Sequence, residues 1–135
     1  KDIYLLLRTE IESHQSLVDL NIGLINVICD YLKINTKCIK LSDILTNIRQ
    51  KTELIIDIGK AVGGNIYFSG QGGGYDYNDE KLLIKNDIEL TYSDFKHPIY
   101  PQLWGAFESH LSIIDLLFNC GPESSRILLK STNPS

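Results

Sequence analysis

The sequence predicts an α/β fold with three layers, in which a mostly parallel sheet lies between flanking helices, as in half of a Rossmann fold. Two observations predict it. Strand-like runs alternate with helical runs along the chain, and a glycine-rich run separates one predicted strand from the helix after it. Single helices between successive strands require right-handed crossovers, which make the sheet parallel. We therefore expect residues 1–130 to form a single α/β domain, followed by a polar tail at residues 131–135.

The predicted helices carry apolar residues at spacings of three and four, which gives each one a buried face. Ser16 is suited to cap the second helix, and Gly63 with Gly64 is suited to end the third. Two closely spaced prolines, Pro98 and Pro101, exclude a regular element around them. The expected helices cover residues 3–13, 16–33, 52–62, 78–85, 111–118 and 122–130.

Three runs alternate between polar and apolar residues and predict strands at residues 36–41, 65–69 and 88–93. A glycine-rich loop follows the second of these strands, and a proline-containing loop follows the third. Ligands of parallel sheets gather at the carboxyl ends of the strands. We therefore expect the two loops to lie on the same edge of the sheet.

Composition excludes several classes of protein. Of the 135 residues, 43% are apolar and 22% are charged, as in an ordinary globular domain, and the net charge of −4 gives no general attraction to nucleic acid or to anionic membranes. We therefore expect no nucleic-acid partner. No apolar run approaches the roughly 20 residues of a membrane-spanning helix, so no membrane span is expected. Three widely spaced cysteines without a Cys-x-x-Cys pair argue against a disulfide framework and a zinc site, and favour the cytoplasm.

The glycine-rich run from Gly70 to Gly74 predicts a substrate site. Its backbone can approach a ligand closely, and its N–H groups can face a phosphate or a carboxylate. The run lacks the Lys-Ser/Thr of a P-loop and the third glycine of a dinucleotide fingerprint, so no cofactor is assigned. The alternative is a simple change of chain direction. The expected substrate contacts in and around the run are Ser69, Gly70, Gly72, Gly73, Tyr75 and Tyr77.

A second cluster lies in the proline-containing loop. His97 is a candidate general acid or base because the pKa of histidine falls near neutrality, and a loop-bracing role is the alternative. Tyr100 and Gln102 are expected substrate contacts. Trp104 is suited to stacking on a flat ligand or to filling the core, and the core is the preferred interpretation. Asp115 lies within an apolar helix, where a carboxylate needs a partner. We expect it to brace the loop at residues 119–122.

No metal site is expected, because His14 and His110 lack ligand spacing. The chain contains no methionine and begins within an apolar pattern, which predicts that it is the carboxyl-terminal part of a longer protein. The absent amino-terminal part is then an expected partner of this domain.

Four stretches resemble the WbqC-like protein family, and the resemblance covers roughly residues 16–125. They are Tyr67–Gly73, Tyr77–Glu80, Asp94–Leu103 and Leu111–Glu123. The family normally opens with His-Gln-Pro, where this chain has Ser16 after His14 and Gln15. Pro-Gly-Gly-Lys is usual where this chain reads Gln-Gly-Gly-Gly, which weakens the case for a tightly bound phosphate. Trp104 stands where a histidine is common.

The family occurs in bacterial gene clusters for O-antigen and other surface polysaccharides. The resemblance therefore implies a role in surface-polysaccharide biosynthesis, with a sugar or nucleotide-sugar as the small-molecule partner. We expect an enzyme that modifies a nucleotide-activated or amino sugar by group transfer. The alternative is a non-catalytic binding or scaffold module within a polysaccharide assembly complex.

Overall fold

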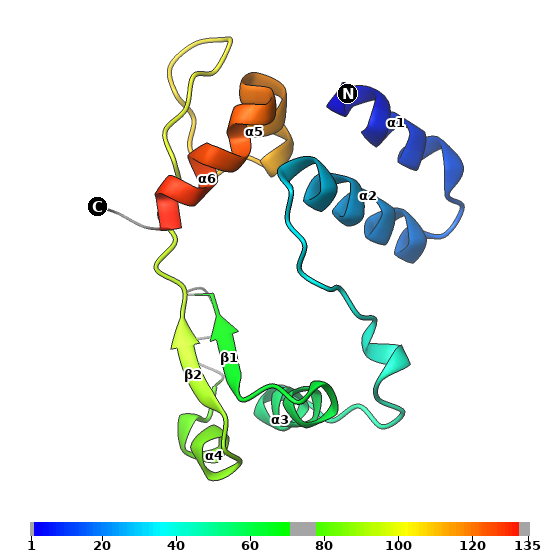
Figure 1. Cartoon of the computed structure of the whole chain (residues 1–135), viewed down its shortest axis with the longest axis vertical. Coiled ribbons are helices and arrows are strands. Elements are labelled where there is room, and N and C mark those ends of the chain that lie inside the picture. The colour runs from blue at the N-terminus through cyan, green and yellow to red at the C-terminus, as the bar shows by residue number, and fades with distance from the viewer. Residues whose placement is uncertain (1, 71–77, 133–135) are drawn as a thin grey trace. The chain divides into compact units, whose positions relative to one another are not determined.

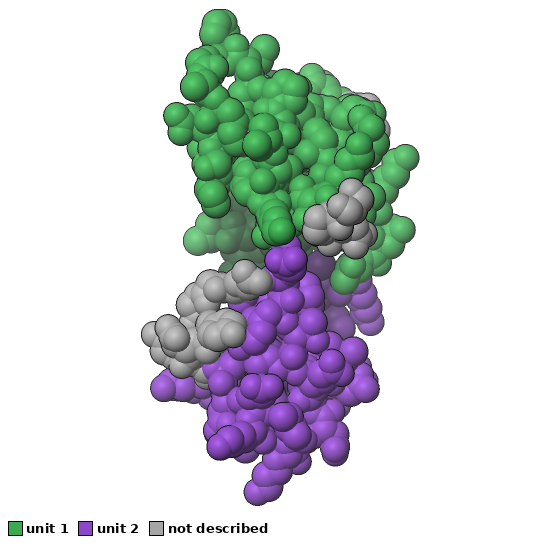
Figure 2. All heavy atoms as spheres, turned by 90° about the vertical axis from the view of Figure 1, so that its left-hand side faces the viewer, with its two compact units in different colours: residues 1–36, 95–135 green, residues 37–94 purple. Residues whose placement is uncertain are grey.

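The computed structural model describes residues 2–70 and 78–132. The chain divides into two compact units, which Figure 2 colours separately. The first comprises residues 1–36 and 95–135, and the second comprises residues 37–94. Each unit is described by itself. The expectation of a single domain over residues 1–130 stays a prediction.

The first unit is helical (Figure 1). Its helices are α1 (Ile3–Ser13), α2 (Leu17–Leu32), α5 (Ile113–Cys120) and α6 (Ser124–Thr132), with a 3-10 turn η2 (Gly121–Glu123) before α6. α1 begins at Asp2, whose carboxylate accepts a hydrogen bond from the backbone N–H of Tyr4 at 3.0 Å. α2 ends where Lys33 adopts a left-handed conformation with φ of 61°.

Apolar side chains from three helices form the core of the first unit. Its buried members are Ile3 and Leu7 of α1, Leu32 of α2 and Leu117 of α5. Gly23 of α2 lies close to α1, because a Cβ there would come within 2.1 Å of the Glu10 carboxylate. The glycine therefore permits a close packing of the two helices.

The second unit combines helices with a small sheet (Figure 1). It contains a 3-10 turn η1 (Leu41–Asp43), α3 (Lys51–Val62), β1 (Ile66–Ser69), α4 (Glu80–Lys85) and β2 (Glu89–Tyr92). The strands pair in parallel, with Ile66 opposite Glu89 and Ser69 opposite Tyr92. α4 lies in the connection between them, as parallel pairing requires. α3 ends at Gly63, which has the left-handed φ of 68° expected of a glycine cap.

Alternation along β1 divides its side chains between two faces. Tyr67 packs against a core of Ile56, Leu83 and Ile88, and Ser69 is buried. Ile66 and Phe68 lie on the other face, with 60% and 66% of their surfaces exposed. β1 therefore has one covered face and one open face among the described residues.

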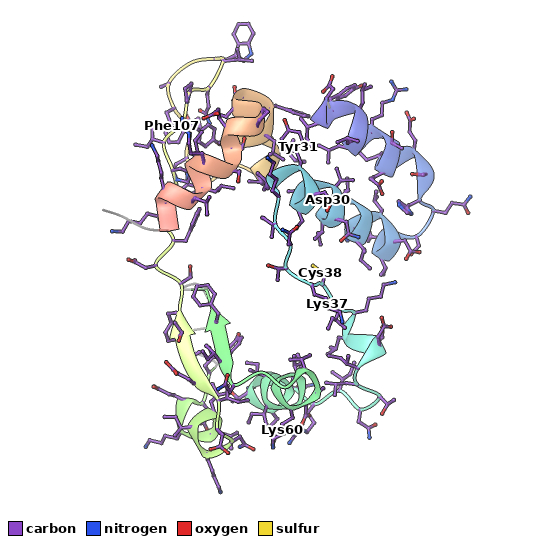
Figure 3. All side chains as sticks on the ribbon, viewed as in Figure 1. Asp30, Tyr31, Lys37, Cys38, Lys60 and Phe107 are labelled. Carbon is purple, nitrogen blue, oxygen red and sulfur yellow. The ribbon has the colours of Figure 1, made fainter. Side chains whose placement is uncertain are left out.

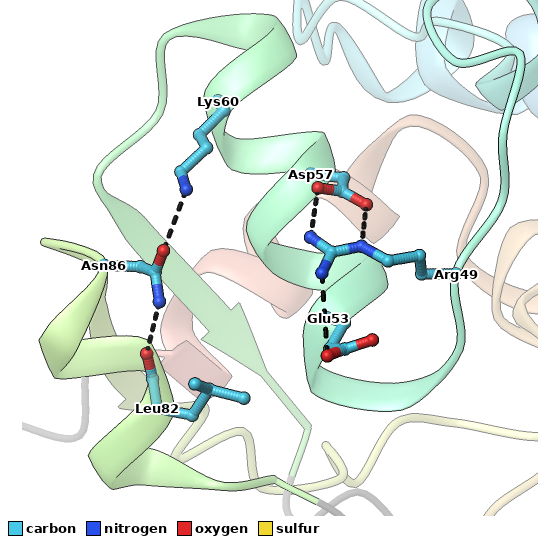
Figure 4. A network of polar contacts seen from close by, with 6 residues as sticks. All are labelled: Arg49, Glu53, Asp57, Lys60, Leu82 and Asn86. Atoms are coloured by element: carbon cyan, nitrogen blue, oxygen red, sulfur yellow. Dashed lines mark hydrogen bonds and ion pairs between the residues drawn. The ribbon is translucent and has the colours of Figure 1, made fainter.

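Polar contacts fix α3 to the chain before it and to the chain after α4 (Figure 4). The Arg49 guanidinium donates two hydrogen bonds to the Asp57 carboxylate, one of them from Nε at 2.6 Å, and also lies near Glu53. The hydrogen bond from Arg49 holds the pKa of Asp57 below its usual value. Lys60 Nζ donates to the side-chain Oδ1 of Asn86 at 2.8 Å, and Asn86 Nδ2 donates to the backbone carbonyl of Leu82.

The α/β class and the parallel pairing of strands 65–69 and 88–93 are confirmed. The strand expected at residues 36–41 is wrong, because these residues have no regular structure until η1 begins at Leu41. The alternating side chains of residues 36–40 are all exposed, so no apolar face is buried there. Alternation without a neighbouring strand does not produce a sheet. The described sheet has two strands, and the three-layer arrangement is not confirmed.

Candidate functional site

The proline-containing loop and α5 form the polar cluster of the first unit. Tyr100 lies in this loop with 5% of its surface exposed. Its ring packs edge-to-face on Phe107, with ring centroids 5.4 Å apart and planes at 85°. Phe107, labelled in Figure 3, comes from the same loop between β2 and α5. The two aromatic rings give the irregular chain a small apolar centre of its own.

Asp115 of α5 is the hub of this cluster. Its Oδ2 accepts hydrogen bonds from the Tyr100 hydroxyl at 2.8 Å and from Gln102 Nε2 at 2.9 Å. Its Oδ1 accepts one from Asn119 Nδ2 at 3.1 Å. An ionised carboxylate offers about four acceptor positions, so one side of Oδ1 retains capacity for a further donor. The carboxylate therefore braces Asn119 and two residues of the proline-containing loop. The loop expected at residues 119–122 is not formed, because Asn119 and Cys120 belong to α5 and η2 follows.

Two amide side chains close the loop on itself and tie it to α5. Gln102 Nε2 donates to the backbone carbonyl of Glu108 at 3.0 Å, and Gln102 Oε1 accepts from the backbone N–H of Glu108 at 2.8 Å. The amide thus imitates one pairing of a β-ladder. The backbone N–H of Leu103 donates to Asn119 Oδ1 at 3.0 Å. Residues 102–108 form a closed loop whose base is fixed and whose tip carries Trp104.

Two groups beside Asp115 are held in their protonated forms. Burial raises the pKa of Tyr100, and the hydrogen bond from its hydroxyl to Asp115 raises it further. Burial also raises the pKa of the Cys120 thiol, with a smaller contribution from the negative charge of Asp115. A raised pKa lowers the fraction of the anionic, more nucleophilic form of each group.

A hollow of about 360 Å³ lies between the closed loop and α5. This volume falls at the lower end of the range of small-ligand sites, roughly 300–1,000 Å³. Trp104 has 87% of its surface exposed, and Phe118 of α5 has 52% exposed. The residues that line the hollow are Gln102, Leu103, Trp104, Glu108, Leu111, Asp115, Phe118 and Asn119.

His97 lies apart from these lining residues, with both ring nitrogens near backbone groups. Its Nε2 accepts a hydrogen bond from the backbone N–H of His110 at 3.2 Å, and its Nδ1 lies 3.0 Å from the carbonyl oxygen of Pro98. The neutral tautomer with a proton on Nδ1 satisfies both contacts. This arrangement favours the loop-bracing alternative. A catalytic role for His97 stays a prediction.

A smaller cavity of about 190 Å³ is lined by both His97 and Tyr100, while Gln102 and Trp104 line the larger hollow. Leu111 lines both. The structure thus brings the sequence-predicted residues of the loop together in one region, but on two cavities. Substrate contact by Tyr100 and Gln102 stays a prediction. In the structure the polar atoms of both side chains bind protein groups.

The glycine-rich run is only partly described. Ser69 ends β1, is buried, and donates from its hydroxyl to the backbone carbonyl of Gly70 at 3.3 Å. Gly70 is exposed, and a Cβ there would have no neighbour within 4 Å. The remaining predicted contacts, Gly72, Gly73, Tyr75 and Tyr77, lie outside the described residues. Their role as an anion site stays a prediction, as does convergence of the two loops.

Sequence reasoning missed several residues of the hollow and misjudged one. Trp104 does not fill the core, so that interpretation was wrong. Glu108, Leu111, Phe118 and Asn119 were not identified as site residues. Phe118 follows Asp115 by three residues, so helical spacing places both side chains on one face of α5. That spacing was the available signal for Phe118. The loop residues gave none.

No group of three or more His, Cys, Asp or Glu side chains within residues 2–70 and 78–132 is placed to hold a metal ion. No helix in the same part of the chain is both long and apolar enough to cross a membrane.

Comparison with known proteins assigns the chain to a family. A protein of Mycobacterium tuberculosis (strain ATCC 25618 / H37Rv), described as "Uncharacterized protein Rv1507c", is 37% identical over 114 residues. The alignment covers 84% of this chain and 48% of that protein, so the chain spans about half the length of this relative. No solved structure matches. The profile of the WbqC-like protein family matches residues 3–127, which is nearly the whole chain. The chain belongs to the WbqC-like protein family.

Proposed function

We propose that this WbqC-like protein binds a sugar intermediate of bacterial surface-polysaccharide biosynthesis in the hollow beside α5. The observation that carries the proposal is the pairing of an exposed Trp104 ring with the Asp115 carboxylate on one hollow. Sugar rings present apolar C–H faces and polar hydroxyl edges. An aromatic ring packs against the C–H face of a sugar. A carboxylate oxygen with spare acceptor capacity accepts hydrogen bonds from the sugar hydroxyl groups.

Preorganisation supports a binding role. The hydrogen bonds made by Gln102, Asp115 and Asn119 hold the base of the loop before any ligand arrives. A ligand then loses less free energy to ordering the site. The Tyr100 hydroxyl, the Gln102 amide and the Asp115 carboxylate already have protein partners, so a surface that positions a sugar fits them better than a proton-transfer centre.

Group transfer remains the second candidate function, and the parallel sheet favours it. Ser69 ends β1 at the carboxyl edge of the strand pair, directly before Gly70 and the glycine-rich run. Such an edge is where α/β proteins bind ligands. The second proposal assigns donor binding to the glycine-rich run and proton transfer to His97, as predicted from the sequence.

Trp104 provides a direct test of sugar binding, because it is the single tryptophan of the chain and lines the hollow. The 135-residue chain is titrated with monosaccharides and nucleotide-sugars while tryptophan emission is recorded, with calorimetry as the second measurement. We expect a saturable change in emission with at least one sugar. Trp104→Phe should weaken binding by calorimetry, whereas Phe68→Ala, which removes an exposed aromatic ring in the other unit, should not. Silence in both measurements for every sugar refutes the proposal.

The group-transfer candidate has its own test. Nucleotide-sugars and acyl donors are incubated with the protein, and products are identified by mass spectrometry. Gly72→Val should reduce donor binding, and His97→Gln should leave binding intact and lower turnover with an altered pH profile. Turnover that is unchanged in His97→Gln removes the catalytic assignment and leaves the histidine as a brace.

A further inference from the structure

The charge of the hollow beside α5 restricts which sugar it can hold. Two of its eight lining residues, Glu108 and Asp115, carry carboxylates, and none is a lysine, an arginine or a histidine. A cleft lined by charges of one sign concentrates the opposite sign, because the low-dielectric walls focus the field. This surface therefore attracts cations and repels phosphates and carboxylates.

The aromatic lining acts in the same direction. Trp104 and Phe118 both border the hollow and are more than half exposed, so their rings are accessible to a ligand. The face of an aromatic ring carries negative electrostatic potential and attracts an ammonium group, tryptophan most strongly. A neutral sugar gains from the rings and from a hydroxyl donor to Asp115, but it lacks the ionic attraction between an ammonium group and the two carboxylates.

An ammonium group can donate hydrogen bonds to the acceptor positions that remain available in the hollow. A protonated primary amine has three N–H donors and no acceptor. Asp115 Oδ1 accepts one described hydrogen bond, from Asn119, and has room for another. The side chain of Glu108 is exposed at the rim, while its backbone N–H and carbonyl are bound by Gln102. The two carboxylates can therefore receive donors without disturbing the closure of the loop.

From the charge, the aromatic rings and the open acceptor positions, we infer that the hollow selects an amino sugar and binds it through a protonated primary amine. This inference rests on the proposed sugar-binding function and goes beyond it by naming the group that is recognised. It also predicts that this hollow does not bind an anionic donor, because the two carboxylates would repel the phosphates of the donor.

The test compares glucosamine with glucose and with N-acetylglucosamine, at a pH at which the free amine is protonated. Binding to the 135-residue chain is followed by Trp104 emission and by the NMR shift of the Trp104 indole N–H. We expect glucosamine to bind about tenfold more tightly than either neutral sugar at low ionic strength, from one weak ion pair and one cation–π contact. The preference should shrink as salt is added.

Glu108→Gln is the decisive variant, because it removes one charge and keeps the shape of an exposed side chain. It should lower the preference for glucosamine over glucose several-fold. Glu80→Gln, which removes an exposed carboxylate in the other unit, is the matched control and should leave the preference unchanged. Equal loss in both variants overturns the inference, since the effect would then come from net charge alone.

Cyclohexylamine and cyclohexanol separate this inference from the proposed function. If all three sugars bind equally, sugar binding stands and the selection of an amine is refuted. If cyclohexylamine shifts the Trp104 signals more than cyclohexanol but no sugar binds, the cation preference stands and the sugar-binding function is refuted. If no probe binds, both are refuted.

Discussion

Replacing Asp115 by asparagine tests whether this carboxylate holds the proline-containing loop in place. Asp115 accepts from Tyr100, Gln102 and Asn119, and the asparagine side chain has a single acceptor oxygen. If that oxygen accepts the hydrogen bonds from Tyr100 and Gln102, the new NH₂ group faces the NH₂ group of Asn119. Two donors then face each other and the hydrogen bond from Asn119 is lost. The variant keeps the volume of the side chain and changes only its charge and its hydrogen-bonding capacity.

The expected cost follows from these three hydrogen bonds. A hydrogen bond to a charged group contributes about 1.5–3 kcal/mol, and a neutral one about 0.5–1.5 kcal/mol. Two weakened bonds and one lost bond then lower the free energy of unfolding by about 2–4 kcal/mol, since partial exposure lets water relieve part of the donor conflict.

Urea unfolding followed by circular dichroism measures the cost, and hydrogen exchange at the backbone amides of Leu103 and Glu108 locates it. Both amides donate to side chains of the network, so both should lose protection. Asp30→Asn, at an exposed position of α2 in the same unit (Figure 3), is the matched control and should change stability by less than about 0.5 kcal/mol. A loss below about 0.5 kcal/mol in Asp115→Asn, with protection of both amides retained, would refute the reasoning.

Three further predictions concern single residues. The folded state raises the pKa of Tyr100 above its ordinary value of 10.0. The stabilisation linked to the protonated phenol is therefore present below pH 10 and is lost as pH rises through the folded pKa. Tyr100→Phe should flatten this alkaline loss of stability in denaturant titrations. Gly63→Ala should cost about 1 kcal/mol in the same measurement because φ is 68°, whereas Gly64→Ala, where an added Cβ meets only ordinary contacts, should cost less. Gln102→Glu replaces the amide donor by a second carboxylate beside Asp115. It should lower the free energy of unfolding by about 2 kcal/mol at neutral pH, and part of this loss should be recovered at low pH. An equal loss at neutral and at low pH would contradict the like-charge argument.

Most helices could be predicted from the sequence, because helical periodicity and end signals are local. The cap at Gly63 lies where that signal placed it, and α2 begins after Ser16 as expected, although the Ser16 side chain makes no capping hydrogen bond. The strand at residues 36–41 failed for the opposite reason. A strand exists only through its neighbour, and alternation along one segment does not say whether a neighbour is present.

The site was predicted in part. The paired prolines correctly placed His97, Tyr100 and Gln102 in irregular chain, and the isolated charge within an apolar helix correctly marked Asp115 as a residue that needs a partner. Trp104 was misjudged because tryptophan is usually buried, and nothing local reveals that the Gln102 amide closes a loop and leaves the tip outside. The hydrogen bonds between the Gln102 side chain and the backbone of Glu108, six residues later, depend on tertiary structure.

The closure of residues 102–108 by one amide also bears on how this site can change during evolution. The bonds that fix the loop involve the side chain of Gln102 and only the backbone of Glu108, so residue 108 can vary without opening the loop. At its base, the described bond to α5 uses the backbone N–H of Leu103. The exposed side chains of Leu103, Trp104 and Glu108 can thus be exchanged while the frame persists, whereas Phe107 packs on Tyr100. Relatives that keep a glutamine and an aspartate at positions 102 and 115 can acquire different ligand preferences by substitution at the tip alone.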